Sequence, residues 1–327
     1  MRQVENKTID NDEAGMRLDR WFRAHYPGLS FGHLQKLLRS GQVRVNGKRV
    51  RANSRVEPGQ LVRVPPLSDQ PIDAEKSPVA GDNELRRFLL HEDDHVLLFN
   101  KPAGLAVQGG SGLTRHVDGL LEAWRDRKGQ KPRLVHRLDR ETSGVLVVAK
   151  TRLAASRLAA AFRSRATKKT YWALVAGVPR PHQGKISTWL ARQRSGEIEK
   201  MRVVGHGAED AAHAVTHYSV VETSGTKLAW LTLRPVTGRT HQLRAQAAHI
   251  GHPIIGDPLY FDDSEWQLPG GMQKRLHLHA RRLVVPHPGG GTLDMTAPLP
   301  AHMRQSWNLL GLDAELGASD IDEAGGG

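Results

Sequence analysis

The chain of 327 residues contains no cysteine. This absence excludes disulfides, thiol nucleophiles and cysteine-ligated zinc, and it fits the reducing cytoplasm in which we expect the protein to act. The mean hydropathy is −0.48, and no apolar run reaches the roughly 20 residues that a membrane-spanning helix needs. The first seven residues, Met-Arg-Gln-Val-Glu-Asn-Lys, are not followed by an apolar segment, so we expect no secretory signal.

Acidic residues are scarce relative to basic ones. The 34 Asp and Glu residues face 47 Lys and Arg residues, which gives a net charge of +13 and a sequence pI near 10.2. Residues 16–66 hold eleven basic residues and two acidic ones, whereas residues 313–327 hold five acidic residues and no basic one. This distribution favours a polyanionic partner that is bound by the N-terminal part.

The N-terminal part has the pattern of a small separate domain. Apolar residues at helical spacing predict two helices, around residues 18–25 and 31–40. Asn46-Gly47 between two short alternating segments predicts a β-hairpin with a type I′ turn, and residues 61–64 predict a further strand. Two helices followed by this hairpin resemble the αL RNA-binding module first named for a small-subunit ribosomal protein.

The resemblance implies an RNA-binding domain at residues 14–66. Its exposed cations would neutralise phosphates, which gives salt-sensitive binding with little base discrimination. The basic residues that we expect to bind RNA are Arg17, Arg20, Lys36, Arg39 and Arg44.

The rest of the chain predicts one larger domain. Residues 65–84 contain four prolines and lack periodicity, so we expect an extended linker at residues 67–84. Residues 85–312 contain several apolar segments of strand length and few helical ones, which predicts an α+β domain with a mixed, largely antiparallel sheet. The family resemblance described below further implies a central cleft in this domain. Residues 313–327 have few apolar side chains and are expected to form a disordered acidic tail.

The most informative segment is residues 136–144, His-Arg-Leu-Asp-Arg-Glu-Thr-Ser-Gly. It places the carboxylate of Asp139 between Arg137 and Arg140, whose positive charges favour an ionised, nucleophilic group. Residues 145–149 follow as an apolar run and predict a buried strand. A structural ion pair in a loop is the other interpretation of an Asp that is flanked by Arg.

This nonapeptide resembles the signature of the RluA-type pseudouridine synthases, in which the Asp is the catalytic residue. Residues 168–171, 238–244 and 276–280 also resemble motifs of that family, in the same order along the chain. The resemblance implies that Asp139, Tyr171 and Arg244 are catalytic, with Tyr171 against the target base and Arg244 paired with Asp139. It further implies that Leu278 forms an apolar wall beside the base. Arg137 would fill the space that the flipped nucleotide leaves.

Two further segments bear on the substrate. Residues 101–104, Lys-Pro-Ala-Gly, also resemble the family, and residues 109–112, Gly-Gly-Ser-Gly, resemble the subgroup that modifies large-subunit ribosomal RNA. Together with the αL module, this favours large-subunit (23S-type) ribosomal RNA. The alternatives are a transfer-RNA or multi-substrate synthase, and a non-catalytic RNA-binding ribosome-assembly factor.

The chemistry that the resemblance implies needs no cofactor, because converting uridine to pseudouridine involves no redox step. His241, His249, His277 and His279 lack acidic or cysteine partners at ligand spacing, so we expect no metal site. We expect a monomer whose partner is RNA and not a membrane.

Overall fold

The computed structural model describes residues 4–10, 13–26, 29, 31–67, 84–110, 113–127, 129–195, 198–262, 264, 266 and 269–317. The chain divides into two compact units, Met1–Ser77 and Pro78–Gly327. No helix in the described part is both long and apolar enough to cross a membrane. Most of the predicted linker, residues 68–83, lies outside the described residues.

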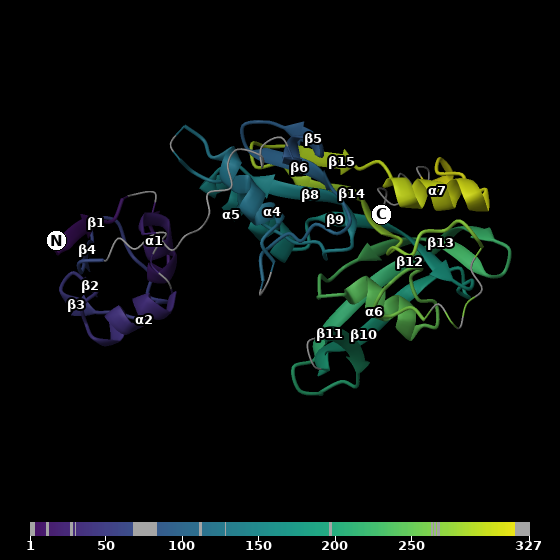
Figure 1. The fold of residues 1–327 in the computed structure, drawn as a ribbon, viewed down its shortest axis with the longest axis horizontal. Coiled ribbons are helices and arrows are strands. Elements are labelled where there is room, and N and C mark those ends of the chain that lie inside the picture. Colours follow the sequence, from purple (N-terminus) through teal and green to yellow (C-terminus); the bar gives the residue numbers. More distant parts are fainter. Residues whose placement is uncertain are drawn as a thin grey trace. The chain divides into compact units, whose positions relative to one another are not determined.

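The first unit consists of two helices and a four-stranded sheet (Figure 1). Asn46 and Gly47 have φ angles of 47° and 73°, as the predicted type I′ turn requires. Trp21 and Phe22 are the largest side chains of its core. The unit begins before the predicted boundary at residue 14, because β1 pairs with β4 and Ile9 is buried. The elements are β1 (Glu5–Thr8), α1 (Leu18–His25), α2 (Phe31–Arg39), β2 (Arg44–Val45), β3 (Lys48–Arg49) and β4 (Leu61–Val64).

The second unit is built on an eleven-stranded sheet, whose main path runs β11-β10-β12-β13-β9-β14-β8-β6-β5. Every described strand pair is antiparallel except β14 with β8, so the predicted mixed, largely antiparallel sheet is confirmed. The strands are β5 (Leu89–Glu92), β6 (Val96–Lys101), β7 (Arg133–Leu134), β8 (Ser143–Ala149), β9 (Lys168–Ala176), β10 (Gln183–Ser195), β11 (Ile198–Val204), β12 (Ala212–Ser224), β13 (Leu228–Pro235), β14 (Leu278–Pro286) and β15 (Thr292–Thr296). The helical elements are α4 (Val117–Leu120), η2 (Leu121–Trp124), α5 (Arg152–Arg163), α6 (Gln242–His249) and α7 (Ala301–Leu310).

Strand β9 is covered on both faces, which explains its unbroken apolar run. Trp172 and its alternate neighbours pack with Trp307 of α7, whereas Ala173 and Val175 pack with Leu243 of α6. Successive strand residues point to opposite faces, so a strand between two helices buries every side chain. The strand and its helices therefore form a buried core next to which Tyr171 of β9 and Arg244 of α6 lie.

The predicted disordered tail begins too early. The main-chain N–H of Asp313 donates to the Glu222 carboxylate at 2.9 Å, and Ala314 packs against the α7 core. Gly317 lies so close to Trp172 and Trp230 that no side chain fits there. Residues 313–317 are therefore ordered by apolar contact, while residues 318–327 lie outside the described part.

Two histidines of the 276–280 segment, His277 and His279, are fully buried in this unit. His277 accepts a hydrogen bond at Nε2 from the Ser306 hydroxyl at 2.7 Å, and His279 accepts one at Nδ1 from Ser143 at 2.9 Å. Burial lowers the pKa of His277 to about 4 and that of His279 to about 3. Both rings are therefore neutral in the folded protein at neutral pH.

These two histidines predict acid lability. Below about pH 6.5, the usual histidine pKa, the unfolded chain binds protons that the folded chain excludes, so stability falls as the pH falls. We expect each ring to lower the free energy of unfolding by about 1.4 kcal/mol per pH unit down to about pH 4. Urea unfolding between pH 7 and 5 measures this slope. His279→Gln should reduce it and the exposed control His249→Gln should not; equal slopes in all three proteins would contradict the assignment.

Candidate active site

Asp139 lies on a turn that enters the fully buried strand β8. The main-chain N–H of Thr142 donates to the Asp139 carbonyl at 3.1 Å and closes the turn. His136 spans the turn, since its Nε2 accepts from the N–H of Val147 at 3.0 Å and its ring stacks on Phe162. Burial lowers the pKa of His136 to about 3, which suits its role as a neutral acceptor. The first residue of the nonapeptide thus holds the backbone on which Asp139 sits.

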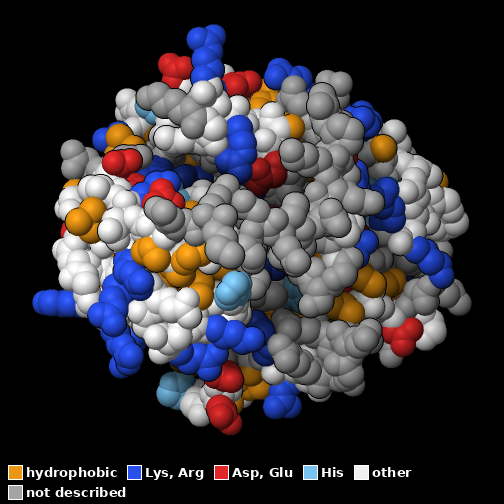
Figure 2. All heavy atoms as spheres, turned by 60° about the vertical axis from the view of Figure 1, so that its left-hand side comes forward, with side chains coloured by type: hydrophobic (Ala, Val, Ile, Leu, Met, Phe, Trp, Pro, Cys, Tyr) orange, Lys and Arg blue, Asp and Glu red, His pale blue; other side chains and the backbone are white. Residues whose placement is uncertain are grey.

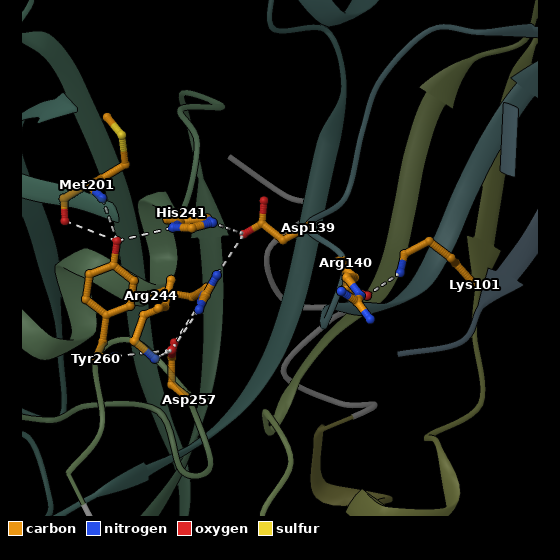
Figure 3. Close-up of polar contacts among 9 residues, drawn as sticks. Lys101, Asp139, Arg140, Met201, His241, Arg244, Asp257 and Tyr260 are labelled. Carbon is orange, nitrogen blue, oxygen red and sulfur yellow. Dashed lines mark hydrogen bonds and ion pairs between the residues drawn. The ribbon is translucent and has the colours of Figure 1, made fainter. Parts of the chain in front are cut away.

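Lys101 holds the same turn from β6, a role that the sequence analysis did not assign. Its Nζ donates to the carbonyl oxygens of Pro102, Leu105 and Arg140 at 2.9, 2.8 and 3.1 Å, and Figure 3 shows the bond to Arg140, the residue that follows Asp139. Burial lowers its pKa to about 7, while the charges of Glu141 and Asp139 oppose that shift. The Lys-Pro-Ala-Gly motif at residues 101–104 was the sequence signal from which a role for Lys101 could have been predicted. Lys101 holds the main chain of the turn that follows Asp139.

The end of the nonapeptide joins Asp139 to the strand that carries Leu278. Ser143 and Gly144 of β8 pair in parallel with His279 and Ala280 of β14. Gly144 has a φ of 113°, and a side chain there would overlap the Ala280 carbonyl oxygen. Glycine is therefore required for the two strands to approach this closely.

Arg244 enters the site from α6, and its principal partner is not the predicted one. Its Nε and Nη2 donate to the two carboxylate oxygens of Asp257, each at 2.7 Å. Its Nη1 lies 3.7 Å from Oδ2 of Asp139, so the predicted pairing is present as a longer contact. The side chains of Arg244 and Asp257 are 4% and 0% exposed, whereas that of Asp139 is 19% exposed. Arg244 is thus fixed by Asp257 and directs its remaining donor group at Asp139.

Helix α6 was not predicted as a helix, because three of its six buried residues are polar. Gln242 donates from Nε2 to the Val215 carbonyl and to Thr216 Oγ1, both at 2.9 Å. Gln246 donates to Thr188 Oγ1 and the Ala214 carbonyl, both at 3.0 Å. Buried glutamines whose side-chain amides are fully hydrogen-bonded therefore take positions that apolar residues occupy in a helix that can be recognised from its sequence.

His241 and Tyr260 form a second approach to Asp139, which sequence reasoning missed. His241 Nε2 lies 4.0 Å from Asp139 Oδ2, and its Nδ1 lies 3.2 Å from the Tyr260 hydroxyl. That hydroxyl accepts from the N–H of Met201 in β11 at 2.7 Å (Figure 3). Burial lowers the pKa of His241. The Tyr260 ring lies under the Arg244 guanidinium, 5.2 Å from centroid to Cζ.

Tyr171 and Leu278 lie on the neighbouring strands β9 and β14. Leu278 is buried, and Tyr171 packs into two apolar clusters. Burial, reinforced by the charge of Asp139, raises the pKa of Tyr171. Its phenol therefore stays protonated and offers a neutral aromatic surface.

All five site residues that we predicted for this unit line one cavity of about 530 Å³. Among the described residues of its lining, Asp139 is the only carboxylate. The basic residues of the lining are Arg137, Arg163, Arg165, Lys169, Arg239 and Arg244. Such a cavity attracts an anion and presents one carboxylate to it.

The five basic residues predicted to bind RNA lie on the first unit. Arg17 pairs with Asp19 at 2.6 Å, and Arg44 donates from Nε and Nη1 to the carbonyl oxygens of Gly41 and Gly47, both at 3.1 Å. The other three are exposed on α1 and α2. In the view of Figure 2, exposed Lys and Arg side chains are more frequent than Asp and Glu side chains.

Comparison with known proteins shows the family of this chain. The RNA pseudouridylate synthase family matches residues 95–249, and the S4 domain family matches residues 16–62. The chain is 38% identical over 316 residues to ribosomal large subunit pseudouridine synthase C of Vibrio cholerae, covering 93% of this chain and 96% of the relative. The chain belongs to the RNA pseudouridylate synthase family. The predicted resemblance, including the RNA-binding module, is therefore confirmed.

Two further relatives support this membership. The protein of the same name from Escherichia coli is 37% identical over 316 residues, covering 92% of this chain and 95% of the relative. The solved structure of human RNA pseudouridylate synthase domain containing 4 superposes with a TM-score of 0.60 and 30% identity, covering 71% of this chain and 95% of that one. Sequence identity and fold similarity thus both support membership of this family.

The Arg244–Asp257 pair predicts a stability effect at the site. Arg244→Met leaves a carboxylate buried without its partner, which should lower the free energy of unfolding by about 3–5 kcal/mol. Asp294→Asn is the matched control, because Arg282 and Asp294 form an equally bidentate but partly exposed pair, whose loss should cost less than about 1 kcal/mol. Denaturant unfolding measures both; similar losses would show that burial of the Arg244 pair does not matter.

Proposed function

We propose that this protein isomerises specific uridines of large-subunit ribosomal RNA to pseudouridine, with Asp139 as its one catalytic carboxylate. The observation that carries the proposal is the isolation of Asp139 among six cations in a single cavity. The names of the Vibrio cholerae and Escherichia coli relatives support the choice of RNA. The S4 domain supplies a second RNA-binding surface. We propose that the protein acts as a cytoplasmic monomer.

The reaction breaks the bond from ribose C1′ to N1 of uracil and forms a bond from C1′ to C5. The proton that leaves C5 is balanced by the proton that N1 gains. Asp139 either attacks C1′ or assists formation of a glycal-like intermediate. Arg244 and His241 both approach Oδ2 of Asp139, and Figure 3 shows Oδ1 pointing away from them. Oδ1 is therefore the oxygen available to the sugar.

The remaining site residues hold the detached base. Tyr171, protonated and apolar, offers a stacking face, and Leu278 offers a dry wall beside it. Arg137 is exposed at the cavity, where it can occupy the space that the flipped nucleotide leaves. No step changes an oxidation state, so these residues suffice without a cofactor.

The proposed role of Asp139 is tested by Asp139→Asn. The substitution keeps the side-chain size but removes the charge and the nucleophilic oxygen, so pseudouridine formation should fall below detection, at least about 1,000-fold. Folding and RNA affinity should persist, because Asp139 is not the main partner of Arg244. Single-turnover isomerisation of a ribosomal RNA fragment, with thermal unfolding of the same sample, measures both. A folded variant with near wild-type turnover would refute the proposed function.

The proposed role of the S4 domain is tested by replacing Arg20, Lys36 and Arg39 together with Gln. If the three cations contact phosphates, the slope of log affinity against log salt concentration should fall by about 2–3. The matched control replaces three cations of the second unit that are exposed and outside the cavity lining, namely Arg180, Lys227 and Arg304. Filter binding of ribosomal RNA at several salt concentrations measures the slopes. Equal slopes for both triple variants would argue against the predicted surface.

A further inference from the structure

His241 has a left-handed backbone conformation. It precedes α6 with φ 49° and ψ 21°. Few residues other than glycine adopt this conformation, although His, Asn and Asp do so more often than most, and its strain persists where the surrounding structure fixes it. The conformation places the imidazole between Tyr260 and Asp139 (Figure 3).

The hydroxyl of Tyr260 is fixed by main chain. It accepts from the N–H of Met201 at 2.7 Å, and its one proton has two possible acceptors, the Met201 carbonyl at 3.1 Å and His241 Nδ1 at 3.2 Å. Donation to Nδ1 leaves the ring proton on Nε2, which faces the Asp139 carboxylate. If the ring proton were on Nδ1 instead, the lone pair of Nε2 would face the negatively charged carboxylate of Asp139. The charge of Asp139 therefore selects the tautomer with Nε2–H.

The turn that carries Tyr260 is part of the same arrangement. Asp257 Oδ1 accepts from the main-chain N–H groups of Leu259 and Tyr260 at 2.9 and 3.2 Å. The same carboxylate clamps Arg244. Both groups that approach Oδ2 of Asp139 are thus positioned by Asp257.

We propose that His241 is a positioning residue for Asp139, acting through a neutral Nε2–H that Tyr260 maintains. This inference rests on the proposed function. The contact of 4.0 Å shortens to a hydrogen bond when substrate fills the cavity, as catalytic contacts do on forming the reactive complex. It then holds Oδ2 and turns Oδ1 toward the sugar.

Two substitutions at His241 separate the donor from the backbone strain. The amide of Gln lies near the place of imidazole Nε2, whereas that of Asn lies near Nδ1 and does not reach Asp139. Asn, however, tolerates positive φ better than Gln. We expect the single-turnover rate of His241→Gln to stay within about tenfold of wild type and that of His241→Asn to fall about 100-fold, since a hydrogen bond to a charged group is lost. A purely structural role predicts the reverse order, which would overturn the proposal.

Tyr260→Phe tests the relay. It keeps the ring beneath Arg244 and should lower the single-turnover rate about tenfold without changing RNA affinity. Tyr218→Phe is the control, because Tyr218 also donates to a main-chain carbonyl, that of Pro181, and does not line the cavity. In the His241→Gln background, Tyr260→Phe should have little further effect, since no Nδ1 remains.

Each single-turnover rate is divided by the concentration of enzyme that binds RNA, so that a loss of folded protein does not change the measured rate. A wild-type rate for Tyr260→Phe, an equal loss for Tyr218→Phe, or losses confined to RNA affinity would overturn the positioning role while leaving the proposed function intact. Absence of pseudouridine with the wild-type protein would overturn both.

Discussion

The buried ion pair between Arg244 and Asp257 is the interaction on which the site depends. Two hydrogen bonds of 2.7 Å, from Nε and Nη2 of Arg244, fix the plane of the guanidinium group. The position of the third nitrogen, Nη1, is then fixed as well, because the group is planar. Nη1 lies 3.7 Å from Oδ2 of Asp139. The pair also joins α6 to the turn that carries Tyr260. A lysine would not replace Arg244, because a single ammonium group cannot fix two oxygens and point to a third.

Four residues of the nonapeptide support the backbone that carries the Asp139 carboxylate. His136 accepts a main-chain N–H of β8, the carbonyl of Arg140 accepts from Lys101, and Ser143 and Gly144 join β8 to β14. The contacts of His136, Ser143 and Gly144 depend on the residue type, through a side-chain acceptor, a side-chain hydroxyl and the lack of a side chain, whereas the contact of Arg140 uses only its main-chain carbonyl. The strength of the motif as a signal follows, since few unrelated sequences would need all these types at these spacings. A nucleophile on a loop requires such support if it is to stay within reach of the sugar carbon.

The sequence predicts the parts of this structure that depend on local periodicity or on a recognised motif. The hairpin at Asn46 and five of the residues that line the cavity were predicted, and the structure brings those five together. Helix α6 and the β10–β11 hairpin were not, because Gln246 and Thr188 occupy buried positions that a pattern of apolar residues would mark. The partner of Arg244 was also missed. Asp257 lies 13 residues away in an irregular turn, and nothing in its local sequence indicates that it is buried.

The basic residues of the cavity divide between two tasks according to burial. Arg244 is buried and its guanidinium is directed at the carboxylates of Asp257 and Asp139, so we do not expect it to bind a backbone phosphate at the rim of the cavity. Arg137, Arg163 and Arg165 are exposed along the same cavity, where they can meet the backbone on either side of a flipped nucleotide. A phosphate contact at the rim is screened by salt, whereas the buried contact is not. Binding is therefore expected to depend on ionic strength much more than the chemical step does, because the electrostatics of the reaction are built into the folded chain before RNA arrives.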